Sequence, residues 1–336
     1  MRIIENYPLL QHNTFRLDVK TRRFVEYESE EDLQKLLRDE QILSQASIHI
    51  GQGSNLLFLG DYKGLIIHSG IKGIEQVKED DKQIWLKVGA AENWDAFVAY
   101  CVEKGWGGIE NLSLIPGEVG ASAFQNIGAY GVEFSDCIAE VHCYCLATGE
   151  KRIFTKEECK YSYRHSFFKE EENRGLYYIT HVVYLLSKKP EYQLNYGNVI
   201  SRLEGKEINL QTVREAIISI RRDKLPDPDI EGNAGSFFMN PYISIAHYEG
   251  LKEHYPSIPH YPVDDAVVKI PAAWLIEQCG LKGRAVGGAA VSVKQALVIV
   301  NQNRATGKEI ALLAEEVRRA VQEKFGIELR PEVNYI

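Results

Sequence analysis

The chain has 336 residues, of which 45% are hydrophobic and 26% are charged, and its formal net charge at pH 7 is −8. This composition is typical of a globular protein of two or three domains and argues against intrinsic disorder. The balance of 39 Lys and Arg against 47 Asp and Glu argues against a protein that binds nucleic acid or an anionic membrane.

The first part of the chain, residues 1–73, is expected to mix helix and strand. Ser29 can cap a helix whose leucines recur at helical spacing. Residues 48–50 predict a short strand that leads into the loop Gly51-Gln52-Gly53-Ser54-Asn55. Glycines bring backbone N–H groups close to a phosphate, so this loop is either a ligand cradle or an ordinary turn. It matches neither the dinucleotide-binding fingerprint nor a P-loop.

The second part, residues 74–222, predicts strands and helices in alternation. Its apolar patterns favour these elements: a strand at 84–88, a helix at 94–101, strands at 138–146 and 176–186, and a helix at 213–220. The stretch from Pro116 to Gly131 shows neither pattern and is expected to be a long loop. It is either held against a flat ligand or packed under a domain junction.

The third part, residues 223–336, opens on Lys224-Leu225-Pro226-Asp227-Pro228, where a lysine beside a rigid turn can meet a phosphate. Ser236 follows, between a glycine and two phenylalanines. It is either a proton donor or a serine that caps a turn, because no G-x-S-x-G elbow is present. Further on, Pro271 is expected to open a helix, and the capping box Thr306–Glu309 predicts another that ends at Gly326.

The cysteines and the apolar runs indicate in which cellular compartment the protein is expected. The six cysteines form no C-x-x-C pair, which favours free thiols in a reducing cytosol. No apolar run approaches the ~20 residues of a membrane-spanning helix, and no signal peptide is recognised. We therefore expect a cytoplasmic protein. We also expect no metal site, because Cys143, Cys145 and His142 lack a second cluster that would complete a coordination shell.

A set of motifs occurs along the chain in a fixed order: Asn13-Thr14-Phe15, Gly51-Gln52-Gly53-Ser54-Asn55, Ile115-Pro116-Gly117, Gln125-Asn126-Ile127-Gly128-Ala129-Tyr130-Gly131, Tyr163-Arg164, Lys224-Leu225-Pro226-Asp227-Pro228, Gly232-Asn233-Ala234-Gly235-Ser236-Phe237-Phe238, Gly287-Gly288-Ala289-Ala290 and Pro331-Glu332-Val333. Over essentially its whole length the chain resembles the UDP-N-acetylenolpyruvoylglucosamine reductase family, also called UDP-N-acetylmuramate dehydrogenases. The single motifs are weak signals, whereas the ordered set is specific.

The resemblance implies an α+β fold with a two-subdomain FAD-binding region of the vanillyl-alcohol-oxidase (PCMH) type and a C-terminal α+β substrate domain. The implied division is 1–73 for the first FAD-binding subdomain, 74–222 for the second and 223–336 for the UDP-sugar domain, whose C-terminal tail returns to the active site. A tyrosine segment near 190–200, with Tyr196, resembles the segment that covers the substrate in the type I enzymes. The implied FAD is non-covalent, and we expect a monomer.

The implied reaction is the NADPH-dependent, FAD-mediated reduction of UDP-N-acetylglucosamine enolpyruvate to UDP-N-acetylmuramate in peptidoglycan precursor synthesis. NADPH reduces FAD and leaves, and flavin N5 then delivers hydride to the enolpyruvyl group. By resemblance, Ser236 donates the proton, and Arg164 and Glu332 stabilise the enolate. A guanidinium suits that role, because it offers a bidentate fork to a carboxylate whose charge grows.

The resemblance also assigns ligand-binding residues. Those implied for the substrate are Tyr163, Tyr196, Lys224, Asn240 and Gln295. Those implied for FAD are Gly51, Gly53, Ser54, Asn55, Pro116, Gly117, Gly120, Ser122, Asn126, Ile127, Gly128, Ala129 and Gly131. Ala121 stands where the family often has serine, so that a flavin contact is either missing or supplied by Ser122.

Two other functions stay open at this point. A related flavin oxidase would use oxygen and another donor, but the stretch from Lys224 to Pro241 resembles the reductases' substrate domain. A non-catalytic module that binds a sugar nucleotide is disfavoured by the joint presence of Arg164, Ser236 and Glu332.

Overall fold

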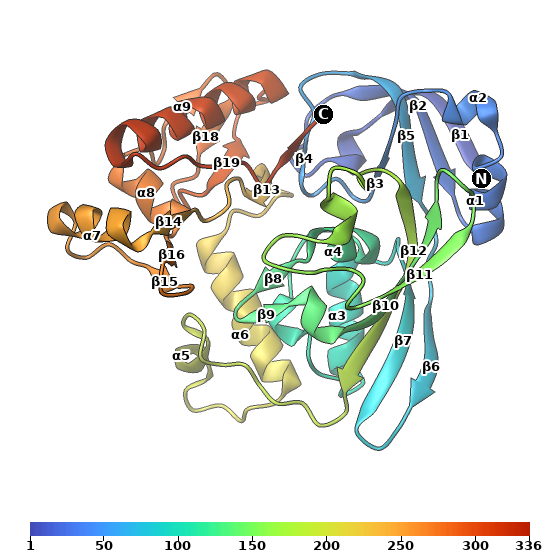
Figure 1. Ribbon diagram of the computed structural model, residues 1–336, viewed down its shortest axis with the longest axis horizontal. Helices are drawn as coiled ribbons and strands as arrows, with labels where there is room; N and C mark the ends of the chain where they lie inside the picture. Colours follow the sequence, from blue (N-terminus) through green and yellow to red (C-terminus); the bar gives the residue numbers. More distant parts are fainter. The chain divides into compact units, whose positions relative to one another are not determined.

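The computed structural model describes the backbone of residues 1–336 and every side chain except that of Leu43. The chain forms two compact units, each built from separated segments (Figure 1). Unit 1 comprises residues 1–7, 21–52 and 63–221, and unit 2 comprises residues 8–20, 53–62 and 222–336. The division into three parts that the sequence suggests stays a prediction.

The N-terminal sheet of unit 1 has the strand order β1-β2-β5-β3, with β1 (Arg2–Pro8), β2 (Lys20–Tyr27), β5 (Tyr62–Ser69) and β3 (Ser47–Ile50). Helices α1 (Glu30–Leu36) and α2 (Glu40–Leu43) lie between β2 and β3 in the chain. Leu33 and Leu36 of α1 share a buried cluster with Val25 and Leu65 of the sheet. The predicted cap is confirmed, because the side chain of Ser29 accepts a hydrogen bond from Asp32 N.

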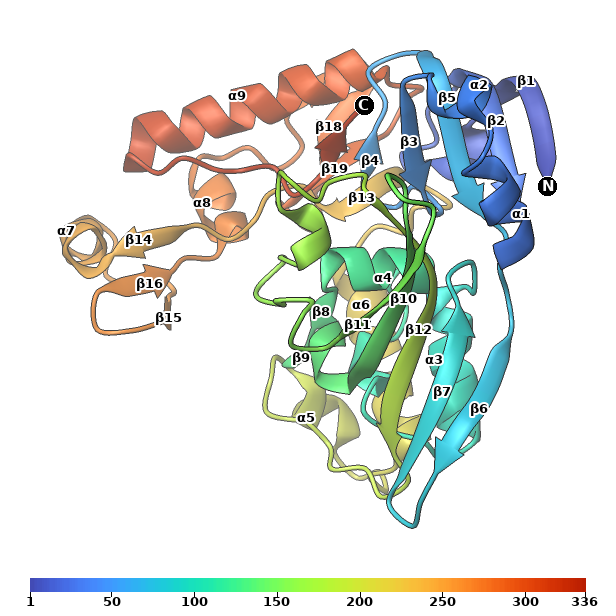
Figure 2. The same ribbon diagram turned by 45° about the vertical axis from the view of Figure 1, so that its right-hand side comes forward.

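The larger sheet of unit 1 is antiparallel, with the order β11-β10-β12-β7-β6. Its strands are β11 (Lys151–Thr155), β10 (Ile138–Cys145), β12 (Tyr177–Ser187), β7 (Gln83–Gly89) and β6 (Ile74–Glu79). Alternate residues of β7 bury Ile84, Leu86 and Val88 in one cluster with Trp94 and Phe97 of α3 (Trp94–Glu103). Figure 2 shows α3 and α4 (Val119–Gln125) beside these strands. The predicted strand at 84–88 and the predicted helix at 94–101 are confirmed by β7 and α3.

The remaining elements complete unit 1. They are η2 (Glu110–Leu112), β8 (Gly128–Ala129), β9 (Val132–Glu133), η3 (Phe134–Cys137), η4 (Phe167–Lys169), α5 (Val199–Leu203) and α6 (Leu210–Lys224). Residues of α6 up to 221 belong to unit 1, and its last three residues belong to unit 2. The apolar side of α6 and residues of α5 form a cluster of their own, which includes Val199, Val213 and Ile217. Partly buried Tyr130, Tyr192 and Leu194 pack against it.

Unit 2 is built on the sheet β13-β19-β18-β17, with β13 (Gly232–Ser236), β19 (Val298–Asn301), β18 (Ala289–Val291) and β17 (Ala285–Val286). Helix α9 (Gly307–Phe325) packs against it, beside α8 (Ala272–Gln278). A second sheet holds β14 (Tyr242–Ser244), β16 (Val267–Lys269) and β15 (Tyr261–Pro262), next to α7 (Ile245–His254). Near the N-terminus, η1 (Leu10–His12) precedes β4 (Leu56–Leu57), which pairs in parallel with β20 (Asn334–Tyr335). The predicted capping box of α9 is confirmed at Thr306 and Glu309.

The stretch Pro116–Gly131 corrects the sequence-based expectation of a loop without helix or strand, since it contains α4 and β8. Helix α4 is rich in small residues and lacks a wide apolar stripe, so periodicity does not reveal it. The small residues serve close packing: a Cβ on Gly120 would lie 2.9 Å from the Cβ of Ala90. The helix ends at Asn126, whose φ of 47° is left-handed.

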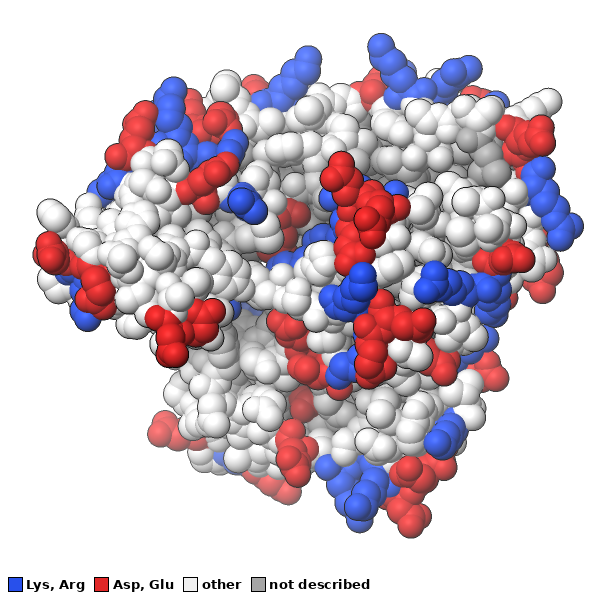
Figure 3. Space-filling view, in the orientation of Figure 1, with Lys and Arg blue, Asp and Glu red and all other residues white. Residues whose placement is uncertain are grey.

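The surface carries both signs of charge. On the face that Figure 3 shows, Lys and Arg are interspersed with Asp and Glu, without a broad basic field of the kind that attracts nucleic acid. Across the part of the chain that the structure describes, no helix has the length and apolar character required to cross a membrane.

Candidate functional site

The residues that the motifs single out fall into two groups, one on each unit. Unit 1 carries Arg164, Tyr163, Tyr196, Gly51 and the Pro116–Gly131 segment, and unit 2 carries Ser236, Glu332, Ser54, Asn55 and the remaining substrate residues.

Arg164 occupies a tight turn. Ser162 and His165 exchange backbone hydrogen bonds of 3.2 and 2.9 Å, so that Tyr163 and Arg164 form the two central positions. Arg164 has a φ of 55°, which is uncommon for a residue with a side chain and is characteristic of turns and functional sites. Its guanidinium lies 5.2 Å from the centre of the Tyr163 ring.

The guanidinium of Arg164 is held against the glycine-rich segment. Its Nη2 donates to Gly128 O at 2.9 Å, and a Cβ on Gly128 would lie 3.1 Å from Nη1. Lys169 Nζ donates to Arg164 O at 2.8 Å and to Gln125 Oε1 at 3.0 Å. The predicted catalytic arginine and the predicted FAD residues Gly128 and Ala129 are therefore neighbours.

Asn126 joins the end of α4 to the arginine turn. It is fully buried, and its Nδ2 donates to Ser162 O at 2.8 Å and to Glu133 Oε2 at 2.9 Å. Its Oδ1 accepts from Ser135 N at 3.1 Å. Both of its amide donors and its acceptor are thus used within unit 1, where they tie the end of α4 to the arginine turn and to residues 133–135.

Tyr196 lies over the end of the same segment. A Cβ on Gly131 would lie 3.5 Å from the Cβ of Tyr196, whose side chain is 49% exposed. Asn111 Nδ2 donates to Tyr130 O at 2.9 Å and to Gln193 O at 2.8 Å, which ties the two stretches together. The predicted tyrosine segment and the glycine-rich segment are thus adjacent in unit 1.

The start of the glycine-rich segment is hydrogen-bonded to α3 and to Ala90, the residue after β7. Trp94 N donates to Gly117 O at 3.0 Å, and Gly120 N donates to Ala90 O at 2.9 Å. Ser122 is buried, and its hydroxyl donates to Val119 O at 2.6 Å and lies 3.3 Å from Tyr184 Oη. The hydroxyl of Ser122 is therefore engaged inside unit 1, and its predicted flavin contact stays a prediction.

In unit 2, three motifs converge around Thr14. Thr14 N donates to Gly53 O, and Thr14 O accepts from Asn233 N at 2.9 Å. Gly53 has a φ of 75°, and a Cβ there would collide with His12 O, so both the conformation and the close approach require glycine. Asn233 in turn donates to Pro226 O at 3.2 Å, which connects the Lys224–Pro228 motif.

Ser236 and Glu332 meet on neighbouring stretches of backbone. Ser236 ends β13, and the next residue, Phe237, accepts a hydrogen bond at its carbonyl from Glu332 N at 2.9 Å. Asn55 Nδ2 donates to Glu332 O at 3.1 Å, and Asn334 N donates to Asn55 O at 3.0 Å. Two predicted catalytic residues and a predicted FAD residue are thereby brought together by long-range pairing.

The other predicted substrate residues of unit 2 are more dispersed. Asn240 Oδ1 accepts from Ala272 N at 2.9 Å at the start of α8, so this side chain supports that helix. Gln295 is half-buried in the turn before β19, and Lys224 is exposed at the end of α6. Their predicted ligand contacts stay predictions.

Three buried polar side-chain atoms have bonding capacity that a ligand could use. Thr14 Oγ1 and Gln52 Oε1 are buried and find no hydrogen-bond partner among the described residues. Arg221 Nε on α6 is also buried and has no hydrogen-bond partner among the described residues. Burial lowers the pKa of this guanidinium below its ordinary value. Buried polar atoms of this kind mark positions where a ligand or water completes the bonding. Arg221 was not found from the sequence, because nothing in its local pattern distinguishes it from a surface arginine.

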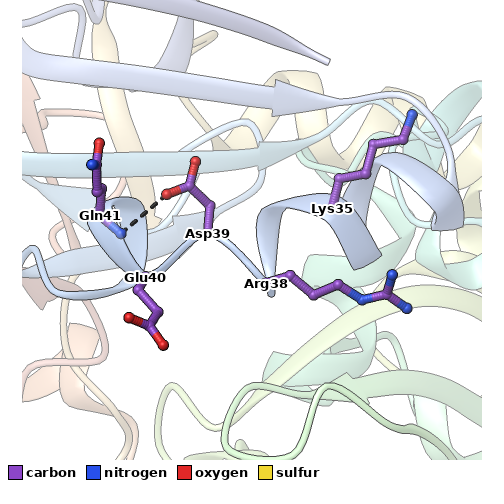
Figure 4. A pocket seen from close by; sticks show the side chains of 5 residues that line it. All are labelled: Lys35, Arg38, Asp39, Glu40 and Gln41. Atoms are coloured by element: carbon purple, nitrogen blue, oxygen red, sulfur yellow. Dashed lines mark hydrogen bonds between the residues drawn. The ribbon is translucent and has the colours of Figure 1, made fainter.

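A separate depression lies at the corner between α1 and α2 (Figure 4). It is lined by Lys35, Arg38, Asp39, Glu40 and Gln41. Asp39 caps α2 through hydrogen bonds from Gln41 N and Ile42 N, which accounts for its carboxylate. None of the motif residues lines this depression, so we do not assign it to the site.

Two family models match the chain. Residues 21–154 match a model described as "FAD binding domain". Residues 227–336 match one described as "UDP-N-acetylenolpyruvoylglucosamine reductase, C-terminal domain".

Curated relatives that are named UDP-N-acetylenolpyruvoylglucosamine reductase match over nearly their whole length. A protein from Bacteroides fragilis is 50% identical over 99% of this chain and 99% of its own. One from Porphyromonas gingivalis is 48% identical over 100% of both chains. A relative from Escherichia coli is 44% identical over 98% of this chain and 96% of its own.

Solved structures support the fold. The reductase of the same name from Thermus caldophilus matches with a TM-score of 0.70 at 22% identity, over 100% of this chain and 99% of that one. A p-cresol methylhydroxylase matches with a TM-score of 0.50 at 10% identity, over 94% of this chain and 82% of that one. The predicted fold, with an FAD-binding region of the PCMH type and a C-terminal α+β part, is thereby confirmed.

Proposed function

Because the chain belongs to the UDP-N-acetylenolpyruvoylglucosamine reductase family, we propose that it reduces UDP-N-acetylglucosamine enolpyruvate to UDP-N-acetylmuramate with electrons from NADPH. The family and the FAD-binding domain make it an FAD-dependent oxidoreductase. We place this activity in the cytoplasm, as a step of peptidoglycan precursor synthesis. The observation that carries the proposal is the pairing that sets Glu332 beside the Ser236–Phe237 strand.

FAD, when bound, supplies the hydride-transfer chemistry. The residues that would hold it are those of the Gly51–Asn55 loop and the Pro116–Gly131 segment. In the loop, the close backbone approach at Gly53 and the unpaired oxygen of Gln52 support binding. Asn126, which directly precedes Ile127 and Gly128, is held in place because its amide group bonds to Glu133, Ser135 and Ser162.

Arg164 binds the substrate carboxylate in this proposal. Its guanidinium already donates to Gly128 O, so part of the cost of ordering this long side chain is met before the substrate arrives. A carboxylate conjugated with a developing enolate gains negative charge as the reaction proceeds, and a guanidinium beside it stabilises the transition state more than the ground state.

Ser236 donates the proton that completes the lactyl ether, and Glu332 acts beside it. Ser236 lies at the end of β13 after Gly235, whose φ of 69° turns the strand. Glu332 is fixed through its backbone by Phe237 and Asn55. A serine hydroxyl is a weak acid, so its proton moves only to a strongly basic carbon, which an enolate provides.

The test is the variant Ser236→Ala in the full chain loaded with FAD. General acid catalysis is typically worth roughly 10²–10⁴-fold, so product formation is expected to fall by that factor. Reduction of the flavin by NADPH is expected to keep its wild-type rate, because that half-reaction needs no proton from Ser236. Ser257→Ala, at an exposed loop position, is the matched control and should leave both half-reactions unchanged. A Ser236→Ala variant that forms product at the wild-type rate would overturn the assignment of the donor.

A further inference from the structure

A buried histidine on β5 bridges two carboxylates in unit 1. His68 Nδ1 lies 2.9 Å from Glu26 Oε2, and His68 Nε2 lies 3.2 Å from Glu118 Oε1. The histidine side chain is 8% exposed, and the two glutamates are 22% and 15% exposed. An imidazole donates from both nitrogens only when it is doubly protonated, so this geometry fits the cationic form.

The groups that face His68 favour its positive charge. Glu26 lies on β2, and Glu118 directly precedes α4. The centre of the Phe24 ring lies 6.1 Å from the centre of the His68 ring. Burial alone would lower the pKa of His68, but the hydrogen bonds and charges of Glu118 and Glu26 outweigh burial and raise it. His49 on β3 stays neutral, since burial and the charge of His68 lower its pKa to about 3.

The other oxygen of Glu118 reaches the first glycine loop. A Cβ on Gly51 would lie 2.9 Å from Glu118 Oε2 and 3.4 Å from the Cβ of Ala121. Glu118 stands at the N-cap of α4, but its side chain makes no capping hydrogen bond to the helix. Its carboxylate is instead turned toward His68 and Gly51, where it connects the two segments that the FAD residues occupy.

A carboxylate at this position has an electrostatic cost for an anionic cofactor. FAD carries a diphosphate, and negative charge beside its binding loops weakens binding unless a positive charge accompanies it. His68 is the cation that lies against this carboxylate.

We propose that His68 is a positioning residue for FAD: in its protonated form it compensates the charge of the Glu118 carboxylate that lies against Gly51, so that Gly51 and the Pro116–Gly131 segment accept the anionic dinucleotide. The inference rests on the proposed function in taking FAD as the ligand of these segments. His68 acts through Glu118.

FAD affinity is expected to depend on pH. The proton on His68 favours FAD binding, so affinity is highest while His68 is charged and falls as the pH rises through its raised pKa. Hydrogen bonds to charged groups are worth more than neutral ones, so loss of the proton is expected to weaken binding about tenfold.

The experiment is a titration of FAD into the flavin-free full chain between about pH 6 and pH 9, the range in which a histidine with a raised pKa titrates. The dissociation constant is followed by quenching of flavin fluorescence. Wild type is expected to lose about tenfold in affinity across this range. His68→Gln is expected to bind weakly at every pH, and Glu118→Gln tightly at every pH, because no carboxylate remains to be compensated.

The double variant His68→Gln/Glu118→Gln separates positioning from a general structural defect. If His68 acts through Glu118, removal of the carboxylate restores the affinity that His68→Gln lost. If His68→Gln does not fold, Glu118→Gln alone tests the proposal, which predicts that its dissociation constant for FAD does not change with pH. His142→Gln is the matched control, since His142 is also buried beside a glutamate, Glu140, and should keep the wild-type profile.

The outcomes are distinguishable. Wild type that binds no FAD at any pH would contradict the proposed function itself. Wild type that binds FAD with a pH profile shared by His68→Gln and Glu118→Gln would overturn the role of His68 alone. A double variant as weak as His68→Gln would also overturn it.

Discussion

At the scale of single residues, the arginine turn is ordered before any ligand binds. Arg164 holds a left-handed φ, a conformation that costs of order 1 kcal/mol for a residue with a side chain. Lys169 and Gly128 fix its carbonyl and its guanidinium through separate hydrogen bonds. Such preorganisation reduces what the substrate must order on binding.

The variant Arg164→Lys tests this. Lysine keeps the charge but loses the planar fork, so kcat/KM for the sugar nucleotide is expected to fall by roughly 10²-fold. The rate of flavin reduction by NADPH and the melting temperature should stay close to wild type. Both half-reactions are measured by stopped-flow absorbance at the flavin band. Arg174→Lys, at an exposed position in the loop that follows, is the control, and an equal effect in both variants would contradict the role of Arg164.

The motif residues could be found from the sequence, but some of their partners could not. Ser236 and Glu332 stand out only because their motifs occur in a fixed order, and the hydrogen bond from Glu332 N to Phe237 O shows why both are needed. His68 and Glu118 lie 50 residues apart, and neither has a local pattern that distinguishes it. Pairs of this kind depend on tertiary packing.

At the scale of elements, α4 shows how packing overrides local pattern. Its small residues let the helix approach Ala90 and present its C-terminal end to the arginine turn. The strongly periodic helices α3 and α9 were predicted correctly, because their apolar stripes and caps are visible in the sequence. Helix α4 could not be predicted from the sequence, since its stability comes from tertiary packing contacts that leave no periodic apolar pattern.

Two glycine substitutions test the packing of α4. Gly120→Ala is expected to destabilise the protein by about 1–3 kcal/mol, because the new methyl group would meet Ala90 at 2.9 Å. Gly250→Ala, in α7, has nothing within 4 Å of the new methyl group and is expected to stabilise by roughly 0.5–1 kcal/mol. Free energies of unfolding in urea measure both. The same sign for both variants would contradict the packing argument.

Helices α3 and α6 are joined by an ion pair of low exposure. Arg214 Nη1 and Nη2 lie 2.7 and 2.9 Å from the two oxygens of Asp95, with side chains 12% and 27% exposed. Asp95 also accepts from Leu114 N, just before the Ile115-Pro116-Gly117 motif. Burial would raise the pKa of Asp95, but Arg214 and Leu114 outweigh it and lower the pKa below its ordinary value.

Asp95→Asn is therefore expected to lower the free energy of unfolding at neutral pH by roughly 2 kcal/mol, because Arg214 loses its charged partner. Since the folded-state pKa of Asp95 is depressed, its contribution is fully present above the unfolded pKa of about 3.9 and is lost as the pH falls through the folded value. Urea unfolding at several pH values measures it, and the difference between wild type and Asp95→Asn should shrink in acid. Glu323→Gln is the control, since its pair with Arg319 is 71% exposed on both sides and is expected to matter by less than about 0.5 kcal/mol.

At the scale of the whole molecule, both compact units are discontinuous in the chain. Residues 8–20 and 53–62 join the C-terminal part in unit 2, where β4 pairs with β20 and Thr14 bonds to Gly53 and Asn233. Composition and local patterns divide a chain into consecutive parts, so they could not reveal this interleaving. The family could be recognised from the sequence because recognition needs only the order of motifs, not their spatial arrangement.

The central claim is that one chain passes electrons from NADPH through FAD to an enolpyruvyl sugar nucleotide. The most direct measurement is the visible absorbance spectrum of the FAD-loaded protein under anaerobic conditions, recorded alone, after NADPH and after UDP-N-acetylglucosamine enolpyruvate. The account predicts flavin bands that bleach with NADPH and return when the sugar nucleotide is added. Bands that bleach but do not return would contradict the proposed substrate, and the absence of flavin bands even after FAD is supplied would contradict the reductase function.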